Sequence, residues 1–270
     1  MKTTILFLLP LASVLSCKEP RKDITPTNTT NPSSAGSQTP PVVEKSGVVK
    51  LGPVVQISGY SVDPNGDKTF LLNGNQLRVV WTRTTNYDYD EQNRLTGEKS
   101  VASYDRNWWE GYSYQYAPDL NTRYQNSENK EFLNTLLLNE QGYLKGNSGP
   151  GEYIYNAEGY LISYNGNGQE DTYTIENGNV IARKTVYRNG SVQYNTYEYD
   201  LTKPGIPSPF TYRGKPSQNL LIKQTLADSA SPTTVFTHYY HFDTKNRPIR
   251  EFVVTDKDPV PRSIREFMYK

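Results

Sequence analysis

The sequence predicts an all-β fold, a twisted antiparallel meander of hairpins built from degenerate Tyr-Asp repeats. Two observations carry this prediction. Between turn signals, Tyr, Thr, Val and Ile alternate with polar residues, which is the period of a strand, whereas helical apolar spacing is scarce. Three Asn-Gly pairs, Asn73-Gly74, Asn177-Gly178 and Asn189-Gly190, join such runs, and both residue types tolerate the positive φ of tight hairpin turns.

The N-terminus has the pattern of an export signal. Lys2 gives it a basic start, and residues 5–15 form an apolar stretch that is too short to remain as a spanning helix. The single cysteine of the chain, Cys17, stands where cleavage would occur. We therefore expect residues 1–16 to be a signal peptide.

The residues around the cysteine, Val14-Leu15-Ser16-Cys17, resemble the lipobox of bacterial lipoproteins, in which the thiol is acylated, for example with palmitate, and becomes the mature N-terminus. The resemblance implies an exported lipoprotein that reaches the membrane through its lipid. The absence of Asp beside Cys17 favours the outer membrane, with the periplasmic or surface-facing side left open. The alternative is an ordinary secretory signal with an incidental cysteine.

Residues 17–47 are expected to form the lipidated Cys17 and a disordered stalk rich in Thr, Pro and Ser. This segment has almost nothing to bury, so it cannot offset the entropy of ordering. Prolines at five positions stiffen it toward an extended polyproline geometry: Pro20, Pro26, Pro32, Pro40 and Pro41. Residues 48–270 then form a single antiparallel β domain, which is long enough to bury a core.

Within this domain we expect strands near residues 77–89, 170–176, 179–188 and 191–200, because each lies beside an Asn-Gly turn. The stretch 130–138 is ambiguous. Leu133, Leu136 and Leu137 have a helical spacing, but the Asn-Glu-Gln-Gly turn that follows suits a strand equally well.

Four segments repeat one pattern: an Asp or Asn after alternating aromatic or apolar residues, then Gly or Asn three residues later, Arg or Tyr, and an apolar residue. They are residues 87–95, 136–144, 153–161 and 240–249. We expect the Asp or Asn to bond the backbone two residues on, and the Gly or Asn to take the left-handed position of a hairpin loop. Steps of 17, 21 and 23 residues along Asn139, Asn156, Asn177 and Asp200 match a meander.

This pattern resembles the Tyr-Asp repeats of the Rhs/YD-repeat proteins. Together with the lipobox, the stalk, the segment 199–221 and a terminal aromatic strand, it is similar to the lipoproteins of domain-of-unknown-function families in Bacteroides-like bacteria, over roughly residues 85–270. The regular Gly-Arg pair of true YD repeats is missing, and only Asn93-Arg94 and Asn246-Arg247 approach it. The resemblance implies a twisted antiparallel sheet and assigns no activity.

The composition argues against several function classes. Lys and Arg number 29 and Asp and Glu 28, so the chain lacks the basic excess that neutralises phosphates, and no nucleic-acid partner is expected. Two His and one Cys are too few for a Cys/His zinc site or an internal disulfide. No nucleophile elbow, phosphate loop or dinucleotide fingerprint is present, so we predict no cofactor, no metal and no enzymatic activity.

The strongest candidate for a binding site is the stretch 108–116. On a strand, five side chains share one face, while Trp109, Ser113 and Gln115 share the other. The five are Trp108, Glu110, Tyr112, Tyr114 and Tyr116. Aromatic rings beside a carboxylate offer flat faces for sugar CH groups and polar tips for hydroxyls. The alternative is that these rings only cover the sheet, since Tyr is a common half-buried strand residue.

Other reactive side chains give weaker signals. Asp88 and Asp90 share a strand face, and Glu170-Asp171 adjoins a turn, but glycoside hydrolysis needs two carboxylates at a fixed separation in a cleft. His238 and His241 are three residues apart, so on a strand they face opposite ways.

The triplet Asp228-Ser229-Ala230 resembles the O-glycosylation signal of the same bacterial group, which implies that Ser229 is a glycan acceptor. The alternative is a plain polar loop before Pro232.

Three function classes remain. The first is a non-catalytic envelope lipoprotein that binds a glycan or an envelope protein through an exposed aromatic sheet face. The second is a structural scaffold, with Trp108 or Trp109 buried and a sheet edge paired with another protein. The third is a carbohydrate-active enzyme with carboxylates that converge in one pocket. The pattern favours them in that order and leaves the ligand, the sheet topology and the oligomeric state open.

Overall fold

The computed structural model describes residues 51–117, 120–125, 131–147, 151–229 and 231–270. The chain divides into two units, residues 1–44 and 45–270, and all the described residues belong to the second. The expected signal peptide, Cys17 and the stalk lie outside the described residues. In the described part of the chain, no helix is both long and apolar enough to cross a membrane.

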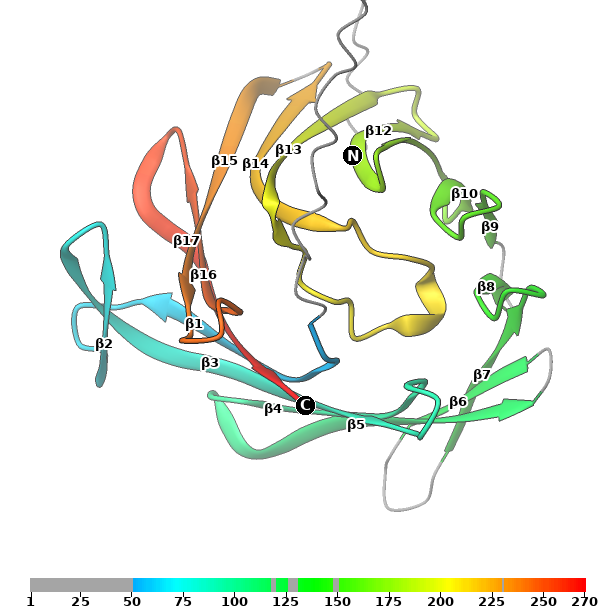
Figure 1. Cartoon of the computed structure of the whole chain (residues 1–270), viewed down its shortest axis with the longest axis horizontal. Helices are drawn as coiled ribbons and strands as arrows, with labels where there is room; N and C mark the ends of the chain where they lie inside the picture. The colour runs from blue at the N-terminus through cyan, green and yellow to red at the C-terminus, as the bar shows by residue number, and fades with distance from the viewer. Residues whose placement is uncertain (1–50, 118–119, 126–130, 148–150, 230) are drawn as a thin grey trace, which may run out of the picture. The chain divides into compact units, whose positions relative to one another are not determined.

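Seventeen strands form one antiparallel sheet (Figure 1). They are β1 (Val54–Val62), β2 (Lys68–Leu72), β3 (Asn75–Tyr89), β4 (Leu95–Ala102), β5 (Asp105–Ala117), β6 (Leu120–Gln125), β7 (Glu131–Leu138), β8 (Leu144–Asn147), β9 (Gly151–Tyr155), β10 (Leu161–Gly166), β11 (Gln169–Glu176), β12 (Asn179–Tyr187), β13 (Val192–Pro204), β14 (Asn219–Asp228), β15 (Ser231–Phe242), β16 (Pro248–Thr255) and β17 (Asp258–Tyr269). A short 3-10 helix, η1 (Thr211–Arg213), lies between β13 and β14. The all-β prediction is confirmed, and the ambiguous stretch near residues 130–138 forms strand β7.

The sheet closes on itself. Successive strands pair from β3 to β17, and β1 lies between β17 and β3, where Ser58 is opposite both Glu266 and Thr84. The shortest link in this series joins β8 to β9 through Gly146 and Glu152. Because β1 closes the sheet, its two faces become an inner and an outer face. Successive side chains along each strand point alternately to these two faces.

The four repeats form the hairpin turns that their sequences predict. In the first, Asp90 Oδ1 accepts the backbone N–H groups of Gln92 and Arg94 at 2.9 Å, and Asn93 takes a left-handed φ of 57°. Asn139 and Asp243 accept the same pair of bonds in their turns, and Asn156 accepts the N–H of Tyr160, four residues on. Gly142, Gly159 and Asn246 take the positive φ. Local side-chain chemistry therefore fixes each turn.

A long connection between β13 and β14, residues 205–218, runs across the inner face of the sheet, and we call it the strap. Figure 1 shows it in yellow inside the curve of the strands. Its backbone N–H groups at Lys215 and Gln218 donate to Gly159 O and Gly178 O, each at 2.9 Å, in the turns β9–β10 and β11–β12. On the opposite side, the Tyr89 hydroxyl donates to Pro209 O at 3.4 Å. The strap is thus tied to distant strands of the sheet.

Two strap residues, Phe210 and Tyr212, pack at the centre of the inner core. Tyr212 is buried among a group of strand residues and tilts against Tyr114, with ring centroids 5.7 Å apart, while Phe210 meets Tyr87 edge to face at 6.1 Å. The other buried members are Leu95, Leu136 and Leu144. Apolar and aromatic burial from five strands therefore depends on one loop.

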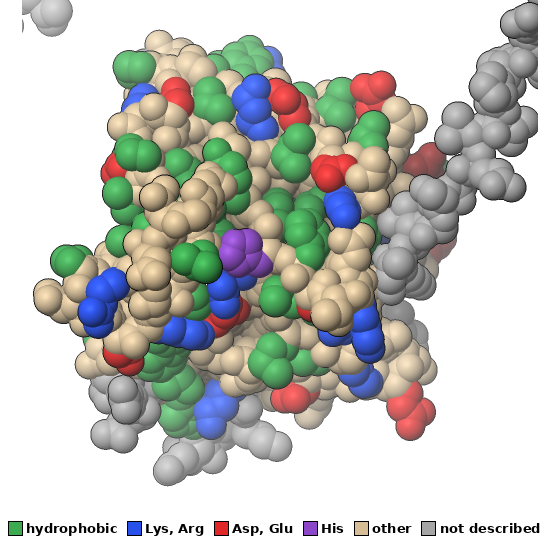
Figure 2. Space-filling model, turned by 60° about the vertical axis from the view of Figure 1, so that its left-hand side comes forward, with side chains coloured by type: hydrophobic (Ala, Val, Ile, Leu, Met, Phe, Trp, Pro, Cys, Tyr) green, Lys and Arg blue, Asp and Glu red, His purple; other side chains and the backbone are tan. Residues whose placement is uncertain are grey.

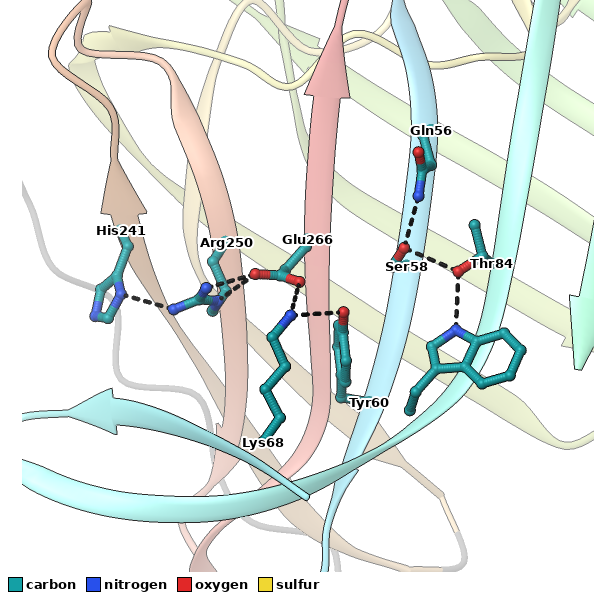
Figure 3. A network of polar contacts seen from close by, with 9 residues as sticks. Gln56, Ser58, Tyr60, Lys68, Thr84, His241, Arg250 and Glu266 are labelled. Atoms are coloured by element: carbon teal, nitrogen blue, oxygen red, sulfur yellow. Dashed lines mark hydrogen bonds and ion pairs between the residues drawn. The ribbon is translucent and has the colours of Figure 1, made fainter. Parts of the chain in front are cut away.

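The hairpin of β2 and the first part of β3 packs on the outer face of β1, β16 and β17. Phe70 meets Phe252 edge to face, with Leu72, Val79 and Ile264 buried around them. Figure 3 shows the polar contacts beside this second core, in which Glu266 lies between Lys68 and Arg250. Lys68 Nζ is 2.9 Å from Glu266 Oε2 and 3.0 Å from the Tyr60 hydroxyl.

The Glu266 contacts predict an acid-sensitive fold. Burial alone would raise the pKa of Glu266, but hydrogen bonds from Lys68, Tyr60 and Arg250 outweigh it and lower the pKa from 4.5 to about 2. A lowered pKa in the folded state contributes stability above pH 4.5 that is lost as the pH falls toward 2. Allowing for solvent screening, we expect this contribution to be about 1 to 2 kcal/mol.

The measurement is the free energy of unfolding of wild type and Glu266→Gln between pH 7 and pH 2. The variant should be less stable at pH 7 and should lose less stability than wild type on the way to pH 2. Parallel curves for the two proteins would show that Glu266 contributes nothing to the pH dependence.

Candidate functional site

The tyrosine row of β5 faces inward. Tyr112, Tyr114 and Tyr116 lie on the inner face, and the Tyr112 hydroxyl donates to Glu110 on the same face. The Tyr114 side chain is only 4% exposed, donates to Glu98 Oε1 at 2.7 Å and packs against the strap. Trp108 belongs to the same strand, and its side chain lies outside the described part of the structure. Most of this predicted binding face is therefore interior packing.

Trp109 points to the outer face, as the alternation along β5 requires. It is 39% exposed, and the Lys99 ammonium lies 4.9 Å from the centre of its ring. This exposure does not fit a scaffold role in which Trp109 is a core residue.

One residue of the predicted row, Tyr116, reaches a pocket of about 540 Å³ beside the strap, which we call the strap-end pocket. Two repeat turns and the strap build its wall. The turn β3–β4 supplies Gln92 and Arg94, the turn β7–β8 supplies Gln141 and Tyr143, and the strap supplies Tyr212. Arg94 and Tyr143 occupy the Arg-or-Tyr position of the repeat pattern, which the sequence identified as structural and not as part of a site.

The pocket wall is preorganised. The Tyr116 hydroxyl donates to Leu95 O at 2.9 Å, and the Arg94 guanidinium covers the Tyr116 ring at 4.5 Å from its centre. Arg94 Nε in turn bonds Asp90 Oδ2 at 2.7 Å. Rings and cation are therefore fixed before any ligand arrives, which reduces the entropy that binding costs.

The chemistry of the pocket is that of binding. Among its described lining residues, Tyr143 and Tyr116 are partly exposed rings, and Tyr212 is buried behind the wall. Three amides provide donors and acceptors, and Arg94 is the charged group. None of these residues is Asp or Glu, so the pair of carboxylates that glycoside hydrolysis needs is not supplied by the described wall. Asp90 is in the adjoining turn, bound to Arg94, and Asp88 lines a different hollow.

Two carboxylates are deeply buried on the inner face, and both are fully engaged. Glu251, 2% exposed, receives hydrogen bonds from Arg265 Nε at 2.6 Å, His238 Nδ1 at 2.9 Å and the Tyr240 hydroxyl at 3.0 Å. Burial alone would raise the pKa of Glu251, but the hydrogen bond from His238 and the charge of Arg265 outweigh it and lower this pKa. A charge held so firmly serves the fold and is a poor proton carrier.

The second buried carboxylate is Asp171. Arg183 binds both of its oxygens, at 3.0 and 2.8 Å from Nη2, and the Thr185 hydroxyl donates to it at 2.6 Å. Its neighbour Glu170 is exposed on the outer face. The predicted Glu170-Asp171 pair is thus split between the two faces of the sheet.

The remaining candidates are separate from the pocket. His238 contacts Glu251 on the inner face and His241 lies 3.5 Å from Arg250 on the outer face, so the two histidines point apart as predicted. Ser229 is exposed in the turn β14–β15, where its N–H donates to Val192 O. Within the described ranges, no three His, Cys, Asp or Glu side chains are placed to hold a metal ion.

Comparison with known proteins gives a likeness in fold. No protein-family model matches the chain, and no curated protein sequence matches it. A crystal structure of a porin-like protein from Bacteroides uniformis is similar, with a TM-score of 0.59 and 14% sequence identity over 82% of this chain and 99% of that one. A porin-like protein from Bacteroides vulgatus gives a TM-score of 0.47 and 13% identity over 81% and 99% of the two chains.

The strap predicts the effect of removing its central ring. Tyr212→Ala should lower the free energy of unfolding by about 3 kcal/mol, because a 5% exposed ring would leave a cavity among Tyr114, Leu95 and Leu136. Tyr194→Ala is the control, since that ring is 51% exposed and its loss should change stability by less than about 0.5 kcal/mol. Chemical denaturation measures both, and equal small effects would mean that the strap does not carry the core.

Proposed function

We propose that this protein is an exported, lipid-anchored outer-membrane lipoprotein without catalytic activity, and that it binds a short glycan in the strap-end pocket. The observation that carries the proposal is the pocket wall, in which fixed Tyr rings and amides surround Arg94. Sugar CH faces stack on such rings, and amides and a guanidinium bond hydroxyls. A volume of about 540 Å³ suits a short oligosaccharide.

The envelope assignment rests on three observations. The fold is similar to that of a porin-like protein of Bacteroides, the N-terminus has the sequence pattern of an export signal, and the residues that end in Cys17 resemble a lipobox. On the outer face of β13 and β14, Glu198 and Lys223 form an ion pair at 2.7 Å, and since charges in lipid are costly, this part of the face suits water. Figure 2 shows charged side chains of both signs among apolar ones on one side of the molecule. A lipid on Cys17 would supply the membrane attachment.

The two competing functions have less support. A scaffold that recruits a partner by edge pairing needs a free strand edge. The closure by β1 leaves the five-residue strand β2, paired with β3 alone in the described part of the chain, as a short edge for such pairing. An enzyme that uses carboxylates needs them in a cleft, whereas Glu251 and Asp171 are each bound by an arginine in the interior. Binding of an envelope protein through the same pocket is the remaining variant of the first class.

The chain offers a matched pair of variants to test the pocket. Arg94 and Arg247 occupy equivalent repeat positions, and each bonds the Asp four residues earlier at 2.7 Å. Each guanidinium also covers a tyrosine, Tyr116 at 4.5 Å and Tyr269 at 5.4 Å. Only Arg94 belongs to the pocket wall among the residues that the structure describes.

Arg94→Ala should therefore weaken binding of a short oligosaccharide, found by glycan array on the full-length chain, by about tenfold, or about 1.4 kcal/mol. Arg247→Ala should bind like wild type while showing the same change in melting temperature. Isothermal titration of both variants gives the comparison. Equal affinities for the two variants, or no short glycan bound by wild type, would contradict the proposed function.

A further inference from the structure

We propose a second carbohydrate-binding surface on the outer face of β3, β4 and β5, which takes an uncharged polysaccharide chain through Trp81 and Trp109. We call it the outer platform. It is separate from the strap-end pocket and does not depend on the function proposed for that pocket. Two of the three tryptophans of the chain lie on it. Four observations carry the proposal.

The first is how Trp81 is held. A register shift in the pairing of β1 and β3 brings Trp81 opposite Tyr60 and so places it on the outer face near Thr84. Such bulges re-aim side chains, often at functional sites. The Trp81 Nε1–H group donates to Thr84 Oγ1 at 2.8 Å, which leaves the ring partly exposed but fixed.

The second is the hydrogen-bond chain that continues from Thr84. Thr84 Oγ1 is 2.9 Å from Ser58 Oγ, which accepts from Gln56 Nε2 at 3.1 Å. Figure 3 shows these side chains in line across β1 and β3. Ser58 is itself only 7% exposed and serves to hold its two neighbours in place. The partly exposed Thr84 hydroxyl and Gln56 amide are thus fixed beside the indole, where they can meet sugar hydroxyls at little cost in entropy.

The third is the position of Trp109. The strand registers place Trp109 opposite Val101 and Val101 opposite Thr84, so the exposed indole lies roughly 10 Å across the strands from Thr84. Trp109 and Trp81 thus flank Val101 and Thr84. Two ring faces on one surface allow more than one sugar unit of a chain to stack, and exposed Trp otherwise costs solubility.

The fourth is a shallow hollow of about 420 Å³ that continues the platform along β1 and β3. Gln56, Asn86, Asp88 and Lys270 line it, and Asn86 is opposite Lys99, the residue that covers Trp109. The hollow has one lysine and one aspartate, Lys270 and Asp88, so it offers donors and acceptors to hydroxyls without an excess of either charge. This mixture favours an uncharged chain.

The test measures binding of the full-length chain to neutral polysaccharides, namely xylan, mannan, galactan and β-glucan, by affinity electrophoresis, with pectate as the acidic probe. We expect wild type to bind at least one neutral polymer. Trp109→Ala should bind that polymer at least about tenfold more weakly. Trp109→Phe should recover part of the affinity. Tyr239→Ala, which removes a 37% exposed ring on β15, should bind like wild type with the same melting temperature as Trp109→Ala.

Arg94→Ala separates this surface from the strap-end pocket. If Arg94→Ala keeps polymer binding that Trp109→Ala loses, the outer platform is supported, whether or not the strap-end pocket binds a short glycan. If Arg94→Ala removes polymer binding and Trp109→Ala keeps it, the outer platform is wrong and the pocket proposal stands. Binding to pectate that weakens with salt, or no binding to any neutral polymer, would also overturn the outer platform.

Discussion

A chain segment that fills the inside of its own sheet is the feature on which the rest of this structure depends. The interior of a sheet that closes through sixteen of its strands, β1 and β3 to β17, is too wide for the side chains of those strands to fill. Residues 205–218 enter that space, and Tyr212 and Phe210 give the inner tyrosines and leucines something to pack against. The same segment forms one wall of the strap-end pocket. One loop therefore contributes to both the core and the strap-end pocket.

The sequence predicts contacts between residues that are close in the chain, and it does not predict contacts between distant segments. The turn at Asp90 is predictable because its hydrogen bonds reach no further than four residues. The closure of β1 on β17 joins segments about two hundred residues apart, and no local pattern encodes it. Alternation correctly separates Trp109 from Tyr114, but it does not say which face is inside, because both faces carry aromatic residues. The sequence marks Arg94 only as a repeat position, because its place in the pocket wall depends on which turns become neighbours.

The charged groups of the molecule divide by location. Inside, Glu251 and Asp171 are each held by an arginine and a second donor. These contacts offset part of the cost of burying a carboxylate and leave little chemistry available. At the strap end and on the outer face, charged groups instead stand beside partly exposed aromatic rings, as Arg94 does at Tyr116 and Lys99 does at Trp109. This division matches a binding protein whose rigid interior supports accessible surfaces.

The most direct test of this account is amide hydrogen exchange across the strap. The N–H groups of Lys215 and Gln218 donate to Gly159 O and Gly178 O, so they should be protected to nearly the same extent as those of strands β13 and β14 that flank the strap. Exchange of the strap amides at the rate of an open surface loop, while the flanking strands stay protected, would contradict the central claim that the strap fills the closed sheet.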